Sequence, residues 1–307
     1  MSESPIFIGG LDRSGKTLLR LALSAHPNIA LTRRTHMWTD FYNRYGDLTD
    51  LANFERCLQA MLDKKAISVL LPDEDRIRRE FLQGERSYPR LFELFHQHFA
   101  EKHGRRRWGE QEALIERYAD PIFQAYPAAR IIHMIRDPRT QYGETLQSTN
   151  VRVRLGKVGS KCGLWQYSAE LAHRNRSHHS GRYMVLTFEY LMTDPERALR
   201  DVCKFIEEDY FPAMITFDGT IRFSAGKDAD PLPSQGWPDS RIKQGFSSPG
   251  ILTIREIRFI ETVVRREMAE NGYDETHVRF SVFDQFLYYF ELPFNLVRFG
   301  GITKFRV

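Results

Sequence analysis

The sequence predicts an α/β fold with a central parallel sheet flanked by helices, and three observations predict it. Short apolar runs typical of buried strands alternate with amphipathic helical patterns, the order that a parallel sheet covered by helices requires. A glycine-rich loop joins the first apolar run to the first helical pattern. The 307 residues are 42% hydrophobic and 13% aromatic, which is enough to form a large core.

The first predicted unit is a strand, a loop and a helix. The apolar run Pro5-Ile6-Phe7-Ile8 is too short for a helix and is followed by two glycines, so it predicts a buried strand. From Lys16 to Ala25, apolar residues recur at helical spacing, and Pro27 ends the pattern. The glycine-rich loop therefore lies between a strand and a helix.

The middle of the chain predicts a helical insertion at about residues 35–104. This stretch is rich in Arg, Glu and Leu and lacks the β-branched runs that a central strand favours. Two further strands are predicted at 130–136 and 182–187. The first of them is followed by Asp137 and Pro138, an N-cap and a proline suited to the first position of a helix.

The last third predicts helices at about 195–206 and 254–271, with a loop rich in Gly and Pro at 218–250 between them. An aromatic-rich segment at about 278–307 follows as an extra C-terminal piece. We expect residues 1–307 to form a single α/β domain that carries this segment and the insertion.

Composition and charge exclude several classes of protein. Forty-four basic against 40 acidic residues give a net charge of only +4, so we expect no nucleic-acid partner, whereas small anionic ligands fit. The three cysteines, Cys57, Cys162 and Cys203, form no CxxC pair, and we expect neither a disulfide framework nor a metal site. No signal-peptide pattern and no run of about 18 apolar residues is present, so we expect a cytoplasmic protein without a membrane span.

The strongest motif is the phosphate-binding pattern GxxxxGK followed by Ser or Thr, which residues 10–17 satisfy in full. Glycines let such a loop curl so that its backbone N–H groups point inward, and the helix N-terminus adds partial positive charge. Arg13 and Lys16 add full charges. Arg136 ends a predicted strand beside a helix start, a place where ligands bind in open α/β sheets.

Four blocks of sequence resemble the sulfotransferases that use 3'-phosphoadenosine 5'-phosphosulfate (PAPS). The stretch from Pro5 to Arg20 with the following Ala25-His26-Pro27 is similar to their opening, which reads PRSGTTLLR and then AHP. Arg107-Trp108-Gly109-Glu110 resembles their RWGEKTP segment, residues 129–139 their RDPR motif, and residues 183–195 their YEDL and DP segment. The resemblance covers about residues 5–273.

The resemblance implies a donor site and a reaction. It implies that the loop holds the 5'-phosphosulfate of PAPS and that Arg136 holds its 3'-phosphate. The loop residues concerned are Arg13, Ser14, Gly15, Lys16, Thr17 and Leu18. A sulfuryl group would then pass to a hydroxyl or amine of an unidentified acceptor, a glycan, a lipid or a small molecule. Arg13 and Lys16 are expected to stabilise the leaving phosphate, and no metal is expected.

Several family positions differ in this chain, and they affect the expected chemistry. Arg34 stands where relatives carry a glutamate base, and a guanidinium accepts no proton. Gln111 replaces a lysine, and Glu144 replaces a serine that helps to bind the 3'-phosphate. His36 is the candidate base, because an extended segment would place it on the same side as Arg34.

Two other readings of the motif remain open at the level of sequence. A magnesium-dependent P-loop kinase fits the complete motif, although Arg136 stands where such enzymes place a metal-binding aspartate and Asp137 only follows it. A catalytically impaired nucleotide-binding relative fits the changes at Arg34, Gln111 and Glu144. The aromatic C-terminal segment also allows a homodimer.

Overall fold

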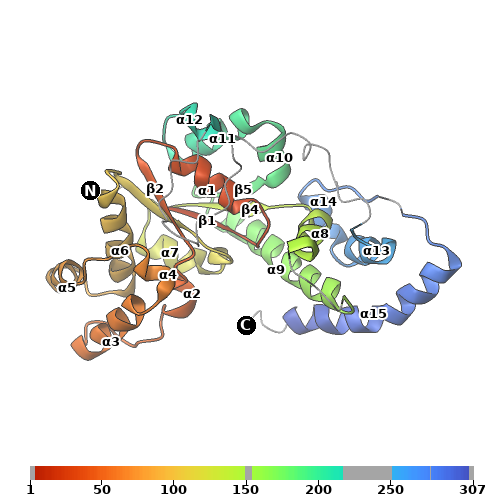
Figure 1. Cartoon of the computed structure of the whole chain (residues 1–307), viewed down its shortest axis with the longest axis horizontal. Helices are drawn as coiled ribbons and strands as arrows, with labels where there is room; N and C mark the ends of the chain where they lie inside the picture. Colours follow the sequence, from red (N-terminus) through yellow and green to blue (C-terminus); the bar gives the residue numbers. More distant parts are fainter. Residues whose placement is uncertain (1–3, 149–153, 217–250, 277, 304–307) are drawn as a thin grey trace.

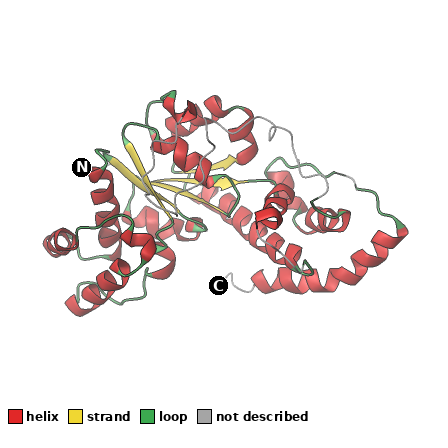
Figure 2. Ribbon diagram, viewed as in Figure 1, coloured by secondary structure: helices red, strands yellow, loops and turns green. Residues whose placement is uncertain are grey.

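Five parallel strands form one central sheet in the computed structural model, which describes residues 4–148, 154–216, 251–276 and 278–303 (Figures 1 and 2). The strand order is β2-β3-β1-β4-β5. The strands are β1 (Ile6–Gly10), β2 (Ile29–Arg33), β3 (Arg107–Gln111), β4 (Arg130–Ile135) and β5 (Tyr183–Thr187). The α/β fold with a parallel sheet, predicted from the sequence, is confirmed.

Strand β1 is the centre of the sheet and alternates its side chains between the two faces. Ile8 aligns with Gln111 of β3 on one side and with Ile132 of β4 on the other. Phe7 belongs to the core under the insertion, whereas Ile6 and Ile8 belong to the core under α1. This period of two is the reason that a short apolar run makes a strand with both faces buried.

The sequence analysis did not predict two of the five strands, β2 and β3. Strand β2 lies directly after α1, and β3 lies between β2 and β1. Only Trp108 is apolar in the β3 sequence, so its pattern gives no strand signal. Gly109 fits because an added Cβ would lie 2.0 Å from the carbonyl oxygen of Ile6.

Helices cover both faces of the sheet and form three groups (Figure 1). The insertion between β2 and β3 contains α2 (Met37–Asp40), α3 (Leu51–Leu62), α4 (Lys65–Ser68), α5 (Glu74–Gln83) and α6 (Tyr88–Lys102). The short η1 (Ile115–Tyr118) and α7 (Ala119–Ala125) follow β3 on the same side. The opposite core holds α1 (Lys16–Ser24), α10 (Phe188–Thr193), α11 (Pro195–Ile206) and α12 (Ala213–Thr216).

The third group packs beside β4 and β5. It consists of α8 (Pro138–Ser148), α9 (Lys157–His178), α13 (Ile254–Val263), α14 (Arg265–Glu270) and α15 (Val282–Thr303). The helix predicted at 254–271 is interrupted at Val264, which separates α13 from α14. The predicted loop at 218–250 lies outside the described residues.

Local signals explain where several helices begin. Ser87 caps α6 by accepting from the backbone N–H of Arg90, and Asp194 caps α11 in the same way. Thr253 and Glu256 form a capping box at the start of α13. Because all five strands run in parallel, their carboxyl ends meet at one edge, and the glycine-rich loop leaves β1 at that edge.

Candidate active site

The loop between β1 and α1 has the backbone that its glycines permit. Gly10 has φ +110° and Gly15 has φ +95°, and Gly15 is the N-cap of α1. A Cβ at Gly10 would lie 2.1 Å from the carbonyl oxygen of Met134, so no larger residue fits there. The loop therefore passes tightly over the end of β4 and presents the N-terminus of α1 to the space above the sheet.

A buried acid network anchors the start of this loop. Glu116 Oε2 accepts from the backbone N–H of Gly10 at 2.9 Å, and its Oε1 accepts from the Ser168 hydroxyl at 2.9 Å. His133 bridges Ser168 at 2.9 Å and the Tyr183 hydroxyl at 2.7 Å, and burial lowers the pKa of this imidazole. The network ties β1, β4, β5 and α9 together beneath the loop, which fixes its position.

Lys16 lies within the loop rather than extending from it. Its side chain is buried, and Nζ donates to the carbonyl oxygens of Gly10 at 2.7 Å and Leu11 at 2.6 Å. Burial lowers the pKa of this ammonium group to about 8, although the nearby Asp12 opposes the shift. A bound anion would return that pKa toward its ordinary value.

Arg136 projects from the end of β4 toward the same loop. Its guanidinium donates to the carbonyl oxygen of Arg13 at 3.0 Å and to Glu144 at 2.7 Å, and it lies 4.0 Å from the centre of the Phe188 ring. Its Nε is buried without a hydrogen-bond partner among the described residues. Trp165 holds the strand end in place by donating to the carbonyl oxygen of Arg136 at 2.8 Å.

These residues line one pocket of about 790 Å³ at the carboxyl edge of the sheet. Six of the residues predicted to bind the donor line it, namely Arg13, Gly15, Lys16, Thr17, Leu18 and Arg136. Ser14 is buried directly behind them, and its hydroxyl has no hydrogen-bond partner among the described residues. An unpaired buried hydroxyl beside two cations fits a phosphate oxygen as acceptor, so the residues present fit a phosphorylated nucleotide.

The three positions that differ from the family pattern also meet at this pocket. Arg34 lines it and forms an ion pair with Asp12, while Glu144 lines it and is paired with Arg136. Gln111 accepts from Arg20 Nε at 3.1 Å. Glu144 thus already pairs with Arg136, so any anion that binds this guanidinium would compete with the Glu144 carboxylate.

His36 takes a different direction from Arg34. Both residues have positive φ, +59° and +41°, so the segment turns after β2 instead of continuing as an extended strand. The His36 side chain is 40% exposed, its Nδ1 lies 3.2 Å from Glu112 Oε2, and that oxygen also accepts from its backbone N–H. Arg34 and Ala113, which lie close in sequence to His36 and Glu112, line the loop pocket. His36 is not among the described residues that line it, so the expectation that His36 lies on the same side as Arg34 is wrong.

Two buried glutamates lie under this turn. Glu110 Oε1 accepts from the backbone N–H of Thr35 at 2.7 Å and from its hydroxyl at 2.5 Å. Its Oε2 has no hydrogen-bond partner among the described residues and lies 4.0 Å from His96 Nε2. Burial raises the pKa of Glu110 to about 8, and it also raises the pKa of Glu112. Glu110 shapes the turn that carries His36, and Glu112 contacts the imidazole itself.

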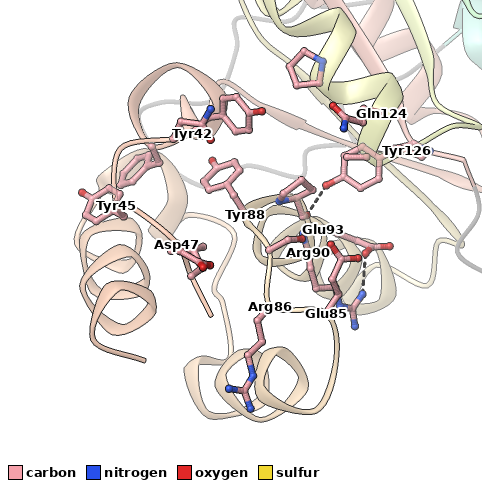
Figure 3. A pocket seen from close by; sticks show the side chains of 18 of the residues that line it. Tyr42, Tyr45, Asp47, Glu85, Arg86, Tyr88, Arg90, Glu93, Gln124 and Tyr126 are labelled. Carbon is pink, nitrogen blue, oxygen red and sulfur yellow. Dashed lines mark hydrogen bonds and ion pairs between the residues drawn. The ribbon is translucent and has the colours of Figure 1, made fainter. Parts of the chain in front are cut away.

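A second pocket of about 700 Å³ lies between the insertion and the amino-terminal edge of the sheet (Figure 3). Four tyrosines line it, and two of their hydroxyls are already paired: Tyr88 donates to Met37 and Tyr126 donates to Pro89, each at 2.5 Å. Arg90 is bound to Glu93 at 2.9 Å. None of the predicted site residues lines this pocket, so the loop pocket is the candidate active site.

Sequence reasoning missed the residues that support the loop from a distance. Gln141 donates to the carbonyl oxygen of Asp12 at 2.6 Å, and Glu116 reaches Gly10 from 106 positions away. Trp165 and Phe188 complete the surroundings of Arg136. Phe188 lies in a block that carried the family resemblance, whereas neither Trp165 nor Gln141 has a local signal in the sequence.

The fold and the site together define an α/β protein with a phosphate-binding loop and an arginine at the adjacent strand end. The family model described as "Sulfotransferase family" matches residues 5–212, and the chain belongs to this family. The resemblance predicted from the four sequence blocks is therefore confirmed.

Two curated relatives are named sulfotransferases, and a solved structure shares the fold. The chain is 24% identical over 218 residues to a protein-tyrosine sulfotransferase of Drosophila melanogaster, a match that covers 68% of this chain and 39% of that protein. It is 21% identical over 254 residues to a putative protein-tyrosine sulfotransferase of Caenorhabditis briggsae, covering 81% and 80%. The sulfotransferase domain from the curacin biosynthetic pathway has a similar fold, with a TM-score of 0.52, 17% identity and coverage of 88% of this chain and 98% of that domain.

Proposed function

We propose that the protein transfers a sulfuryl group from PAPS to a hydroxyl or amine. The observation that carries this proposal is the shared pocket, in which the loop, Lys16 and Arg136 converge with a buried and unpaired Ser14 hydroxyl. A ligand with phosphates at two separate positions would engage the loop with one and Arg136 with the other. Family membership favours this donor over ATP.

The loop residues bind and polarise the 5'-phosphate in this proposal. In the reaction the bond from sulfur to the 5'-phosphate oxygen breaks, a new bond from sulfur to the acceptor oxygen or nitrogen forms, and 3'-phosphoadenosine 5'-phosphate (PAP) leaves. Arg13 and Lys16 stabilise the charge that develops on the leaving phosphate. The N-terminus of α1, from Gly15 through Leu18, supplies backbone N–H groups to the same oxygens.

Arg136 binds the 3'-phosphate once Glu144 has been displaced. Stacking on Phe188 keeps the guanidinium in place while its partner changes. The free Nε provides a donor that Glu144 does not use. A magnesium-dependent kinase is less favoured, because it would need Asp137 as a metal ligand. Both carboxylate oxygens of Asp137 already accept hydrogen bonds from Arg139, at 3.0 and 2.6 Å.

His36 is the proposed proton acceptor. Glu112 orients its Nδ1, which leaves Nε2 to receive the proton of an acceptor hydroxyl entering past Arg34 and Ala113. The half-exposed imidazole can be reached from solvent. Relatives named protein-tyrosine sulfotransferases make a tyrosine hydroxyl the first acceptor to test, ahead of glycan, lipid and small-molecule hydroxyls.

Three wider predictions remain proposals. We propose one domain over residues 1–307 with the insertion at about 35–104 and the aromatic segment at about 278–307. A cytoplasmic location is supported by three buried cysteines that form no disulfide. A homodimer is the third proposal, and sedimentation velocity of the purified chain tests it. None of the described helices is long and apolar enough to cross a membrane.

The direct test is transfer of label from PAPS carrying ³⁵S in its sulfuryl group. Acceptors are a tyrosine peptide with acidic flanks, a matched phenylalanine peptide, a hydroxyl-bearing glycan and a hydroxylated lipid. We expect label on one hydroxyl-bearing acceptor and at least 100-fold less with Lys16→Met, because a leaving-group cation contributes on the order of 10²-fold or more. Binding of PAP without transfer to any acceptor would favour the catalytically impaired reading.

A further inference from the structure

Two buried polar atoms lie close together beneath the turn that follows β2. They are Glu110 Oε2 on β3 and His96 Nε2 on α6, which are 4.0 Å apart, and neither has a hydrogen-bond partner among the described residues. Both side chains are fully buried, and Phe92 and Trp108 pack on the imidazole ring. Because an unpaired buried polar atom is costly, one of the two atoms should carry a hydrogen that the other accepts.

His96 carries its N–H hydrogen on the other ring nitrogen. Nδ1 lies 2.9 Å from the carbonyl oxygen of Phe92, and a carbonyl oxygen only accepts, so Nδ1 is the donor. Burial lowers the pKa of this imidazole to about 4, so at pH 7 the ring is neutral and holds one N–H hydrogen. Nε2 is therefore an acceptor, and a hydrogen between the two atoms has to come from Glu110.

The contacts of Glu110 leave only Oε2 for this hydrogen. Oε1 accepts from the backbone N–H of Thr35 at 2.7 Å and from its hydroxyl at 2.5 Å. The Thr35 hydroxyl itself accepts from the backbone N–H of Met37 at 3.3 Å, so its own hydrogen points to Glu110. A hydroxyl at Oε2 would donate to His96 Nε2 directly after an approach of about 1 Å, or through one bridging water.

Glu112, just after the end of β3, has surroundings that favour its charged form. Its carboxylate accepts from the backbone N–H of His36 at 3.0 Å and from that of Ala113 at 2.7 Å, and Oε2 lies 3.2 Å from His36 Nδ1. Burial, and then the charge of Glu112, raise the pKa of Glu110 to about 8. At pH 7 the proton therefore lies on Glu110 and the negative charge on Glu112.

We propose that Glu110 is a positioning residue that acts as a neutral acid, donating toward His96 from Oε2 while Oε1 holds Thr35. Thr35 lies between Arg34 and His36, whose φ angles of +41° and +59° require support from the surrounding structure. A neutral Glu110 also leaves Glu112 as the single negative charge beside the imidazole of His36. The effect on turnover rests on the proposed function of His36 as the base.

Loss of this proton should loosen the turn at alkaline pH. Oε2 and His96 Nε2 would then be two acceptors facing each other, and the Glu110 and Glu112 carboxylates would both be charged. Tyr88 of α6 is also close to Glu110, and burial raises the pKa of its hydroxyl so far that it stays neutral. With saturating PAPS, whose phosphate keeps Lys16 charged, kcat should fall with a midpoint near pH 8.

The test compares two substitutions of Glu110. E110Q copies the neutral acid, because its amide oxygen can accept from Thr35 and its NH₂ group can donate toward His96. It should retain the kcat at pH 7 and remove the fall near pH 8. E110A should lower kcat about 10- to 100-fold with PAP affinity unchanged, since misplacing a catalytic group by about 1 Å costs up to that much. E267Q, at a buried glutamate of α14, is the matched control and should keep the unmodified pH profile.

Spectra determine the protonation state without relying on activity. ¹⁵N NMR should show His96 with its hydrogen on Nδ1, and the infrared difference between the unmodified chain and E110Q at pH 7 should contain the C=O band of a protonated carboxyl group. Hydrogen on Nε2 of His96, absence of that band, or an E110Q variant as impaired as E110A would overturn the proposal. If the unmodified chain transfers no sulfuryl group, the proposed function fails, and the two spectra still decide whether Glu110 is a neutral acid.

Discussion

Binding of PAP should be accompanied by uptake of a proton at alkaline pH, and the proton should go to Lys16. The pKa of the buried ammonium is lowered to about 8 by desolvation, so at pH 8.5 about a quarter of the Lys16 side chains are charged. A phosphate at Lys16 would return the pKa to about 10.5, where nearly all are charged. The uptake should therefore be about 0.75 protons per PAP bound.

Isothermal titration in two buffers of different ionisation enthalpy measures this number at pH 8.5. The phosphates of PAP are fully ionised there, because their second pKa lies near 6. At pH 6.5 Lys16 is charged with or without ligand, so its uptake should vanish, and the partly protonated phosphates of PAP should instead release protons on binding. Lys16→Met should abolish the uptake, whereas Lys161→Met, at an exposed lysine of the same pocket, should leave it unchanged.

The same shift has a consequence for stability with a definite sign. Between pH 8 and 10.5 the unfolded chain holds a proton on Lys16 that the folded chain has lost, so this residue makes stability rise with pH across that window. A heat of PAP binding that does not depend on the buffer at pH 8.5, or equal uptake in Lys16→Met, would refute the account of Lys16.

Three other variants test the site. Arg136→Ala should weaken the binding of PAP about 10-fold or more relative to the binding of adenosine 5'-phosphate, because only PAP can form the charge-assisted pair. Equal losses of affinity for both ligands would place the 3'-phosphate elsewhere. Burial raises the pKa of Glu110 to about 8, so its contribution to stability is present below about pH 4.5 and is lost as pH rises through 8. Glu110→Gln should therefore flatten the decline in melting temperature between pH 5 and 8. An unchanged decline would mean that other groups cause it. His36→Ala should lower kcat by about 10²–10⁴ with PAP affinity unchanged, and Glu112→Gln should lower kcat by releasing the imidazole that it orients. Full turnover by His36→Ala would exclude this residue as the base.

The sequence predicted the loop, the central strand and the strand-end arginine because each has a local signal. Residues 10–17 match a motif whose glycines serve the backbone at that point, and Ile6 to Ile8 are apolar because both faces of β1 are buried. The helix at 195–206 has its N-cap and proline in adjacent positions, and the structure places α11 at those residues.

What the sequence could not predict depends on contacts between distant residues. Strand β3 contains Glu110 and Gln111, polar residues whose types suggest exposure. Both are buried, and they form hydrogen bonds with Thr35 and Arg20 from other parts of the chain. The direction of the His36 side chain depends on the positive φ angles of Arg34 and His36, and neither is a residue type that predicts a turn. Glu144 stands where relatives carry a serine, and only the fold shows that its carboxylate pairs with Arg136.

The central claim is that the loop pocket binds a nucleotide with a 3'-phosphate through arginine and lysine. A thermal shift series with PAP, adenosine 5'-phosphate and ATP with Mg²⁺ tests it most directly, with Lys16→Met and Arg136→Ala alongside. The account predicts that PAP without added metal gives the largest rise in melting temperature, and that both variants reduce it. A rise with ATP and Mg²⁺ and none with PAP would contradict it and restore the kinase reading.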